Sequence, residues 1–395
     1  MKEMNVESCM FEGFDCGCMR YLGIHEKLQG NRTGGIMRER WSKERIWDWY
    51  NARPWIMGCN YVPALTVCYA ELWREDVRPE VMESVKKEMV LLEETGINAV
   101  RMFLPFDVWY YKREGFFEML DEILELLDSH GMTLMPVIFN DCAAFVRPDP
   151  VFPPELPKGW QPYALGHHGG AIENPFIGDK LRTGWILFDE EEWVEPQFEY
   201  EKELITRYKD DPRILVWDLW NEPGNSNRHT KSLELLKRTF AIAREIDPIQ
   251  PLTAGPWQFP KGYGVDENAR LETIQQAALD MSDLVTFHLY ESFEEVKNAT
   301  EELKKEGRPM MNTEWMNRIL GNNLLEILPY FKENNVGSYH WGLVAGKSQH
   351  FLPWDYLREI PGLDCSKWQH DIYHEDFTPY DEKEIAMLKE FSPRK

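Results

Sequence analysis

The hydrophobic positions of this chain follow two patterns that alternate from residue 55 to the C-terminus. Short apolar runs are typical of buried parallel strands, and each is followed by a segment whose apolar residues recur at helical spacing. The apolar runs lie at residues 55–64, 97–106, 132–140, 214–223, 252–257, 284–290, 308–315 and 336–344. The helical patterns lie at residues 78–95, 115–130, 193–209, 230–246, 269–281, 293–306, 323–334 and 380–391. Repeated strand-helix units of this number predict a (β/α)8 TIM barrel.

Residues 1–54 precede this alternation. Weak periodicity and several glycines up to about residue 40 predict an irregular N-terminal extension. Residues 42–53 predict a short helix that is capped by Ser42 and packs on the barrel. The chain therefore divides into an N-terminal part, residues 1–54, and a barrel, residues 55–395.

A long loop rich in proline and glycine follows the third predicted strand, from residue 141 to about residue 189. Loops of this length are uncommon inside a compact domain and are usually functional or disordered. The strand-to-helix loops of a barrel surround the C-terminal ends of its strands. We therefore expect this loop to form a wall or lid of the site that the barrel holds.

Composition narrows the range of partners. The chain has 44 basic and 67 acidic residues, a net charge of −23, which argues against nucleic acid and anionic membranes as partners. No apolar run approaches the length of a membrane span, and no secretory signal is visible near Met1. The seven cysteines have no zinc-binding spacing, so we expect free thiols and a cytoplasmic location.

Two of the predicted strands end in a glutamate, Glu222 on the fourth and Glu314 on the seventh. Catalytic groups of barrels lie at these C-terminal ends. Hydrolysis of a glycoside needs two carboxyl groups, one to protonate the leaving oxygen and one to attack the anomeric carbon or activate water. Because the fourth and seventh strands face each other across the barrel mouth, we expect the two carboxyl groups to lie about 5 Å apart.

Polar residues at neighbouring strand ends suit this chemistry. Arg101 could keep Glu314 ionised, and Tyr290 could donate its hydroxyl to the same carboxylate. Asn221 could bind the 2-hydroxyl of the sugar, and His288 could lie near the acid. The charge of Glu314 would then raise the pKa of Glu222. Three tryptophans could stack on sugar rings, Trp341, Trp257 and Trp109. Of these, Trp257 and Trp109 could equally belong to the core, whereas Trp341 is expected to line the sugar site.

The segments Trp-Asn-Glu-Pro around Glu222 and Thr-Glu-Trp around Glu314 resemble the clan A glycoside hydrolases, most nearly the family 5 (cellulase-like) group. The resemblance spans residues 55 to about 344. It implies a retaining double displacement in which Glu222 is the acid/base and Glu314 is the nucleophile. It also assigns further positions of the family's site to Arg101, Asn221, His288, Tyr290 and Trp341. The third strand departs from the family, which often has a histidine there, because this chain has Asn140 and Asp141.

The predicted function is a retaining β-glycoside hydrolase that acts on β-linked oligo- or polysaccharide without a metal or other cofactor. One alternative is a non-catalytic carbohydrate-binding barrel. Another is a metal-dependent lyase or isomerase, which would need a cluster of ligands at the strand ends. Two histidine pairs, His167 with His168 and His370 with His374, lack a metal-binding motif and are expected at the surface. The sugar, the linkage, the oligomeric state and the choice between endo and exo action stay open, although a loop that closes one end of the cleft would favour exo action.

Overall fold

The computed structural model shows a sheet of parallel strands in the order β5-β4-β3-β2-β1-β8-β7-β6. It describes residues 39–67, 69–142, 155–156, 158–160, 163–169 and 186–394. Within these residues the eight strands are β1 Met57–Asn60, β2 Ala99–Phe103, β3 Thr133–Asn140, β4 Trp217–Asn221, β5 Leu252–Thr253, β6 Val285–His288, β7 Met310–Trp315 and β8 Gly337–Trp341. Each lies inside one of the predicted apolar runs, which confirms the strand prediction.

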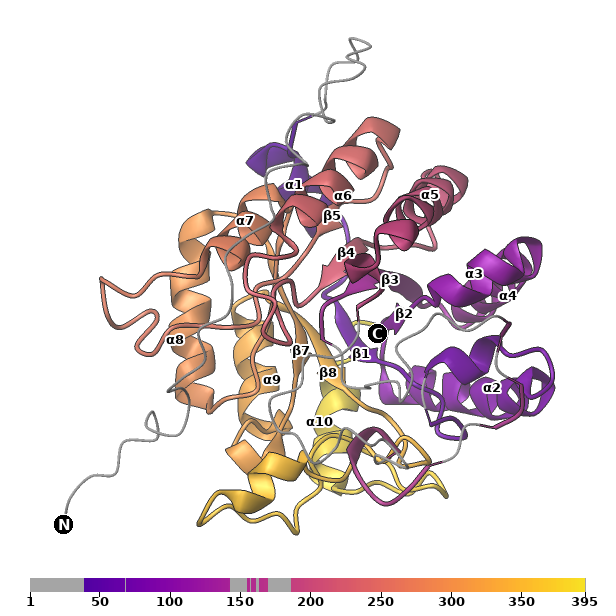
Figure 1. Ribbon diagram of the computed structural model, residues 1–395. Coiled ribbons are helices and arrows are strands. Elements are labelled where there is room, and N and C mark those ends of the chain that lie inside the picture. Colours follow the sequence, from indigo (N-terminus) through magenta and orange to yellow (C-terminus); the bar gives the residue numbers. More distant parts are fainter. Residues whose placement is uncertain are drawn as a thin grey trace, which may run out of the picture. The chain divides into compact units, whose positions relative to one another are not determined.

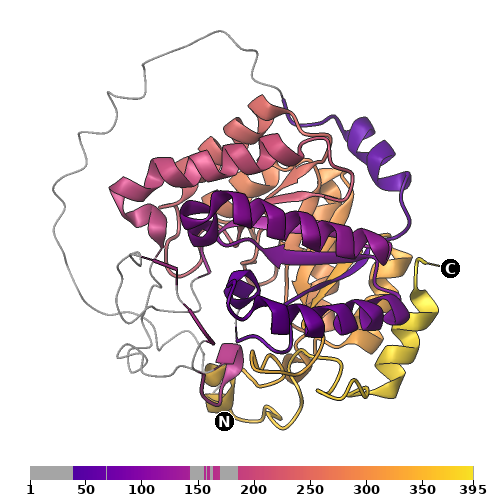
Figure 2. The same cartoon turned by 90° about the vertical axis from the view of Figure 1, so that its right-hand side faces the viewer.

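Helices surround these strands (Figure 1). Those that follow β1 to β8 in turn are α2 Arg78–Thr95, α4 Arg113–Ser129, α5 Glu191–Tyr208, α6 Leu233–Ile246, α7 Thr273–Met281, α8 Phe293–Leu303, α9 Leu324–Glu333 and α10 Glu382–Phe391. Two of them, α2 and α4, lie in front of the strands in Figure 2. One short helix was not predicted, α3 Phe106–Tyr111, which lies between β2 and α4.

The predicted helical faces are the buried ones. In α2 the apolar residues Val81, Val85, Met89 and Leu92 are all buried. Gly96 ends this helix in the left-handed conformation, with φ of 94°, which glycine adopts without strain. Packing of such faces against the strands builds the larger of two apolar clusters. Within the described residues we find no helix with the length and apolar content needed to span a bilayer.

The ring of strands closes between β5 and β6. The backbone N–H of Asp283 donates to Leu252 O at 2.8 Å, and that of His288 donates to Pro256 O at 3.0 Å. A Cβ at Gly255 would lie 2.8 Å from the carbonyl oxygen of Thr286, so glycine permits this close approach. The strands therefore form a nearly closed barrel, and the predicted (β/α)8 fold is confirmed.

A second apolar cluster lies at the N-terminal ends of the strands. It joins Ile46 and Tyr50 of helix α1 (Lys43–Asn51) to strand residues such as Met311 and Tyr339. The helix begins where predicted, since the hydroxyl of Ser42 accepts from the N–H of Arg45. These contacts place α1 against the end of the barrel opposite to the predicted site.

Two predicted segments fall largely outside the described residues. They are the N-terminal extension up to residue 38 and most of the loop from residue 141 to 189. Of that loop the structure describes its first and last residues and three short pieces, the longest of which spans residues 163–169.

Asp283 joins the closure of the barrel to the N-terminal segment. Its carboxylate accepts hydrogen bonds from Arg244 at 2.7 and 2.8 Å, from Trp41 N at 2.8 Å and from Leu252 N at 2.8 Å. The side chain of Asp283 is fully buried. One carboxylate thus connects α6, β5 and the residues before α1.

We expect Asp283→Asn to lower the free energy of unfolding by about 3 kcal/mol, because it leaves the buried guanidinium of Arg244 without its counter-charge. The exposed Asp280 on α7 offers a matched control, and Asp280→Asn should change stability by less than about 0.5 kcal/mol. Urea unfolding followed by tryptophan fluorescence measures both. Equal stability of the two variants would show that Asp283 does not hold the closure.

Candidate active site

The first glutamate lies at the C-terminal end of β4. All five residues of this strand are buried, as expected for a parallel strand covered on both faces. Glu222 follows the strand with a positive φ of 46°, which side-chain-bearing residues rarely adopt. Such conformations cluster at functional sites, where the surrounding structure holds them. The turn after β4 therefore sets the direction of the Glu222 side chain.

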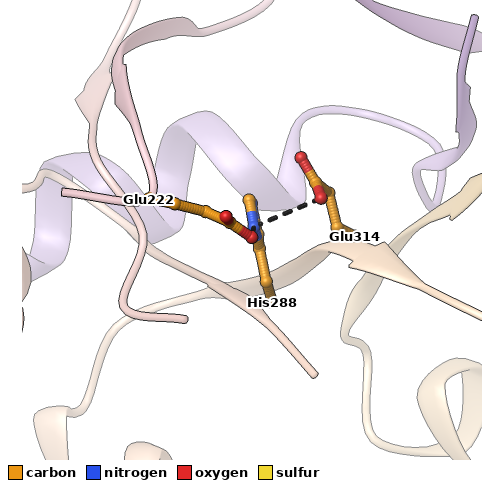
Figure 3. Close-up of side chains that lie close together, drawn as sticks. All are labelled: Glu222, His288 and Glu314. Atoms are coloured by element: carbon orange, nitrogen blue, oxygen red, sulfur yellow. Dashed lines mark hydrogen bonds and ion pairs between the residues drawn. The ribbon is translucent and has the colours of Figure 1, made fainter. Parts of the chain in front are cut away.

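The second glutamate, Glu314, lies near the C-terminal end of β7, whose residues are also all buried. The pairing of β6 with β7 is irregular between Phe287 and His288, so that His288 lies opposite Glu314. One carboxylate oxygen of Glu222 and one of Glu314 lie within 4.8 Å of each other. Figure 3 shows the two side chains approaching from opposite sides with His288 between them. The structure thus brings the two predicted glutamates together.

Arg101, on β2, connects the strands that carry these residues. Its guanidinium donates to Glu314 Oε1 at 2.6 Å, to Asn221 Oδ1 at 2.6 Å and to Asn60 Oδ1 at 2.7 Å. It also forms an ion pair with Asp218 at 2.7 Å. Burial alone would lower the pKa of Arg101, but the carboxylates of Asp218 and Glu314 raise it above its ordinary value. The guanidinium therefore stays charged beside Glu314.

His288 and Tyr290 contact the glutamates from β6 and the residues after it. Nδ1 of His288 lies 2.9 Å from Glu222 Oε1 and 3.5 Å from Glu314 Oε2. The hydroxyl of Tyr290 donates to Glu314 Oε2 at 3.0 Å. Burial lowers the pKa of His288 to about 4, so its imidazole is neutral at pH 7. Each oxygen of Glu314 therefore has a hydrogen-bond donor, Arg101 for Oε1 and Tyr290 for Oε2.

Burial is the main influence on both glutamates. It raises the pKa of Glu222, against hydrogen bonds from Cys142 and Asn225 and the charge of Arg101. This differs from our expectation, which named the charge of Glu314 as the cause. Burial also raises the pKa of Glu314, and there His288 and Arg101 oppose it while the charge of Glu222 adds to it. The direct contact with Arg101 favours Glu314 as the carboxyl group that ionises first.

Several contacts of the pair were missed in the sequence. The amide of Asn225 donates to Glu222 Oε2 at 2.5 Å, and Asn140 Oδ1 accepts from Asn221 at 2.8 Å. Asn140 also accepts from the backbone N–H of Cys142 at 2.7 Å, which fixes the residue whose thiol hydrogen-bonds Glu222. Asn140 is the last residue of β3, and Cys142 and Asn225 lie in the segments that follow β3 and β4. The one available signal was their place at the ends of predicted strands.

The three candidate tryptophans have different surroundings. Trp341 ends β8 and is partly exposed, with its ring centroid 6.3 Å from that of Phe103. Trp257 is partly exposed and donates from Nε1 to Pro223 O, directly after Glu222. Both lie next to the residues of the site.

Trp109 is instead part of the core. It lies in α3 with 2% of its surface exposed, packs against Tyr200 of α5 and donates from Nε1 to Glu203. The apolar run of β2 gives way to this unpredicted helix, whose Trp109 indole packs against α5. The structure therefore contradicts a role of Trp109 in lining the sugar site. The expectation that His370 lies at the surface was also wrong, because 1% of its surface is exposed.

Glu222, His288 and Glu314 have the residue types and spacing that could hold a metal ion, since one ligand atom of each lies within 4.8 Å of the others. The surroundings oppose this use. Arg101 places a positive charge 2.6 Å from Glu314 Oε1, and a cation in the group would be repelled by it. Proton transfer and nucleophilic attack suit the group better than metal binding.

The fold and the pair of buried carboxylates define a class of protein, the (β/α)8 barrels with the arrangement that glycoside hydrolysis requires. The relatives of this chain in sequence agree with this class. Over 102 residues the chain is 32% identical to the protein named "Probable mannan endo-1,4-beta-mannosidase F" of Emericella nidulans. The matched stretch covers 23% of each of the two chains. Over 274 residues it is 20% identical to the protein of the same name from Aspergillus flavus, covering 65% of this chain and 51% of that one. The chain thus spans about half the length, or less, of these curated relatives.

Solved structures share the fold. The endo-β-1,4-mannanase of Thermotoga petrophila matches 87% of this chain and 77% of its own, at 16% identity and a TM-score of 0.50. The β-1,4-D-mannanase of Cryptopygus antarcticus matches 86% of this chain and 90% of its own, at 12% identity and a TM-score of 0.51. No family model matches the sequence. The relatives in sequence support the resemblance to the family 5 (cellulase-like) group of clan A glycoside hydrolases, and the solved structures show that the fold is shared.

The neutral state of His288 can be measured directly. We expect its ring resonances to stay unchanged from pH 8 down to about pH 5 and to move as the pH approaches 4, because burial disfavours the imidazolium. Nitrogen NMR of the histidine side chains follows this, and the signal lost in His288→Gln assigns the residue. Titration of that signal near pH 6.5 would contradict the burial of the imidazole between the two glutamates.

Proposed function

We propose that this protein hydrolyses β-glycosidic bonds of oligo- or polysaccharides with retention of configuration, with Glu222 as acid/base and Glu314 as nucleophile. The observation that carries the proposal is the pair of buried carboxylates with oxygens within 4.8 Å. Retaining enzymes hold their carboxyl groups about 5–5.5 Å apart, whereas inverting enzymes leave room for a water between them.

The contacts support this assignment of the two roles. Glu314 attacks the anomeric carbon, so it must be ionised, and Arg101 and Tyr290 donate to its two oxygens. Glu222 gives its proton to the leaving oxygen as the bond from that oxygen to the anomeric carbon breaks. This step leaves a glycosyl-enzyme ester at Glu314 and releases the aglycone. Glu222 then takes a proton from water as that water attacks the anomeric carbon and frees Glu314. Burial, which raises the pKa of Glu222, favours the protonated form that the first step needs.

The substrate follows from the relatives only as a first choice to test. Their printed names describe mannan endo-1,4-beta-mannosidases. We therefore propose β-1,4-linked mannose chains as the first substrate and β-1,4-linked glucose chains as the second. We also propose a cytoplasmic location. The free thiols of Cys59, Cys142 and Cys365, the cysteines within the described residues, support it.

The decisive experiment compares variants of the two glutamates on activated aryl β-glycosides. Glu314→Gln should lower kcat by at least about 1,000-fold, since no glycosyl-enzyme can form. Glu222→Ala should lose turnover of substrates with poor leaving groups, because these need its proton. With a dinitrophenyl substrate, azide should raise the turnover of this variant by giving a β-glycosyl azide. Glu234→Gln, at an exposed position of α6, is the control and should retain full activity.

Two outcomes would count against the proposal. Normal activity of Glu314→Gln would remove the assigned nucleophile. Sugar binding without hydrolysis on any of the tested β-glycosides would favour the non-catalytic carbohydrate-binding barrel instead.

A second prediction concerns pH. Tyr290→Phe removes a donor to Glu314 Oε2, which stabilises the ionised form of that carboxylate. The pKa of Glu314 should therefore rise, and the acidic limb of kcat/KM should move to higher pH, with a plateau lower by roughly tenfold or more. Tyr330→Phe is the matched control, because Tyr330 also donates to a glutamate, Glu301, but at the surface. An acidic limb that stays in place, or that moves to lower pH, would contradict the role of Tyr290.

A further inference from the structure

Three loops of the barrel mouth are joined on one side of the site. Residues 163–169, from the long loop after β3, contact the loop after β8 at residues 346–352. Gly169 N donates to Ser348 O at 2.8 Å, and Gln349 Nε2 donates to Ala164 O at 2.6 Å. The loop after β8 in turn contacts the loop after β1, where Lys347 N donates to Ala64 O at 2.9 Å. We call residues 163–169 and 346–352 together the mouth wall; Figures 1 and 2 both show the magenta segment beside the yellow loops.

The mouth wall is packed without room for side chains at its junctions. A Cβ at Gly169 would lie 2.3 Å from Val67, and one at Gly346 would lie 2.0 Å from the carbonyl oxygen of Ala64. Both distances are shorter than any real contact, so glycine is required at both points. Both parts of the mouth wall therefore pack closely on the loop after β1, Gly346 against its backbone and Gly169 against the side chain of Val67.

Histidine rings line the inner part of the mouth wall. The ring centroid of His168 lies 4.9 Å from that of His350, and Nδ1 of the first lies 3.2 Å from Nε2 of the second. His167 lies 5.2 Å from His370, which follows the wall in sequence. Burial lowers the pKa of His168 to about 4 and that of His370 to about 3. Both ring nitrogens of His350 and of His370 are bonded within the protein, to Ser348 and His168 and to Met316 and Gln369, so these rings act as packed, uncharged parts of the wall.

The same rings reach the sugar site on the side of Glu314. Trp341 lies 5.7 Å from His350 and 6.2 Å from His168, measured between ring centroids. Tyr290, which donates to Glu314, lies 5.5 Å from His370. The sugar that becomes bonded to Glu314 is the glycone, and Glu222 serves the leaving aglycone. Trp257, bonded to Pro223 O, lies beside Glu222, so the mouth wall and Trp257 mark opposite ends of the site.

We propose that the mouth wall blocks the glycone end of the site, so that the protein removes short units from the non-reducing ends of neutral β-linked oligosaccharides rather than cutting inside long chains. This inference rests on the proposed hydrolysis. It differs from the endo mode that the printed names of the relatives describe for those proteins.

The test uses β-1,4-mannohexaose and cellohexaose that carry a fluorophore at the reducing end. Exo action should leave the label on chains shortened stepwise, with an unlabelled mono- or disaccharide as the early product. Internal cutting gives short labelled fragments from the start and would overturn the proposal. Turnover of aryl β-glycosides with neither hexasaccharide cleaved would overturn it as well. Absence of cleavage of every substrate, aryl glycosides included, would instead reject the hydrolase function itself.

A variant separates the mouth wall from other causes of exo action. His168 has φ of 55°, which glycine adopts freely, so His168→Gly removes the imidazole without straining the backbone. We expect it to raise the fraction of internal cleavage about fivefold, the effect of roughly one hydrogen bond. Asn335→Gly is the matched control, since Asn335 has φ of 52° and is exposed just before β8, at the opposite end of the barrel. Exo products that His168→Gly leaves in the same proportion as the control would show that the mouth wall does not cause them.

Discussion

The site depends on one buried guanidinium. Arg101 has 1% of its surface exposed, and removing a charge from water to this degree is unfavourable unless partners replace the water. Its partners are Asn60, Asp218, Asn221 and Glu314, from β1, β4 and β7. The planar guanidinium fixes the directions of these contacts, which a lysine could not reproduce. The positions of the strand ends relative to one another, and hence of the two glutamates, follow from this contact set.

Arg101 also decides how much negative charge the site can hold. Its single positive charge offsets one of the two carboxylates that contact it, Asp218 and Glu314. An ionised Glu222 would add a further negative charge to the same buried region, with its Oε2 bonded to the neutral amide of Asn225. The free energy is therefore lower when Glu222 keeps a proton than when Glu314 does. The proposed division between acid and nucleophile rests on which carboxylate lies within 2.6 Å of the guanidinium.

The sequence predicted the parts that repeat and missed those that occur once. The alternation of apolar runs and helical patterns locates β4 and β7, and fold geometry then brings Glu222 and Glu314 together. Trp109 was misjudged because an apolar run does not show where a strand gives way to a buried helix. His370 was misjudged because residues distant in the sequence surround it, among them His167, about two hundred positions earlier, and Tyr290. Pairings between distant loops leave no periodic signal in one sequence.

The turn after β4 shows how the long loop and Glu222 are connected. Glu222, Ser226, Asn227 and His229 all have positive φ, a conformation that costs about 1–3 kcal/mol at each such residue and needs support from outside the turn. That support comes from the end of β3. Asp141 accepts from Gly224 N at 2.8 Å and pairs with Arg228 Nε at 3.0 Å. Arg228 also pairs with Asp189 at 2.9 Å.

Both ends of the long loop therefore bind the same arginine, since Asp141 opens the loop and Asp189 lies where it leads into α5. The ion pairs are largely buried on the Arg228 and Asp141 side, where the loss of one partner is costly. Because Asn225 lies between Gly224 and Arg228 and donates to Glu222, the turn cannot relax without moving the donor on the acid/base. The loop that supplies the mouth wall thus also fixes the direction of Glu222.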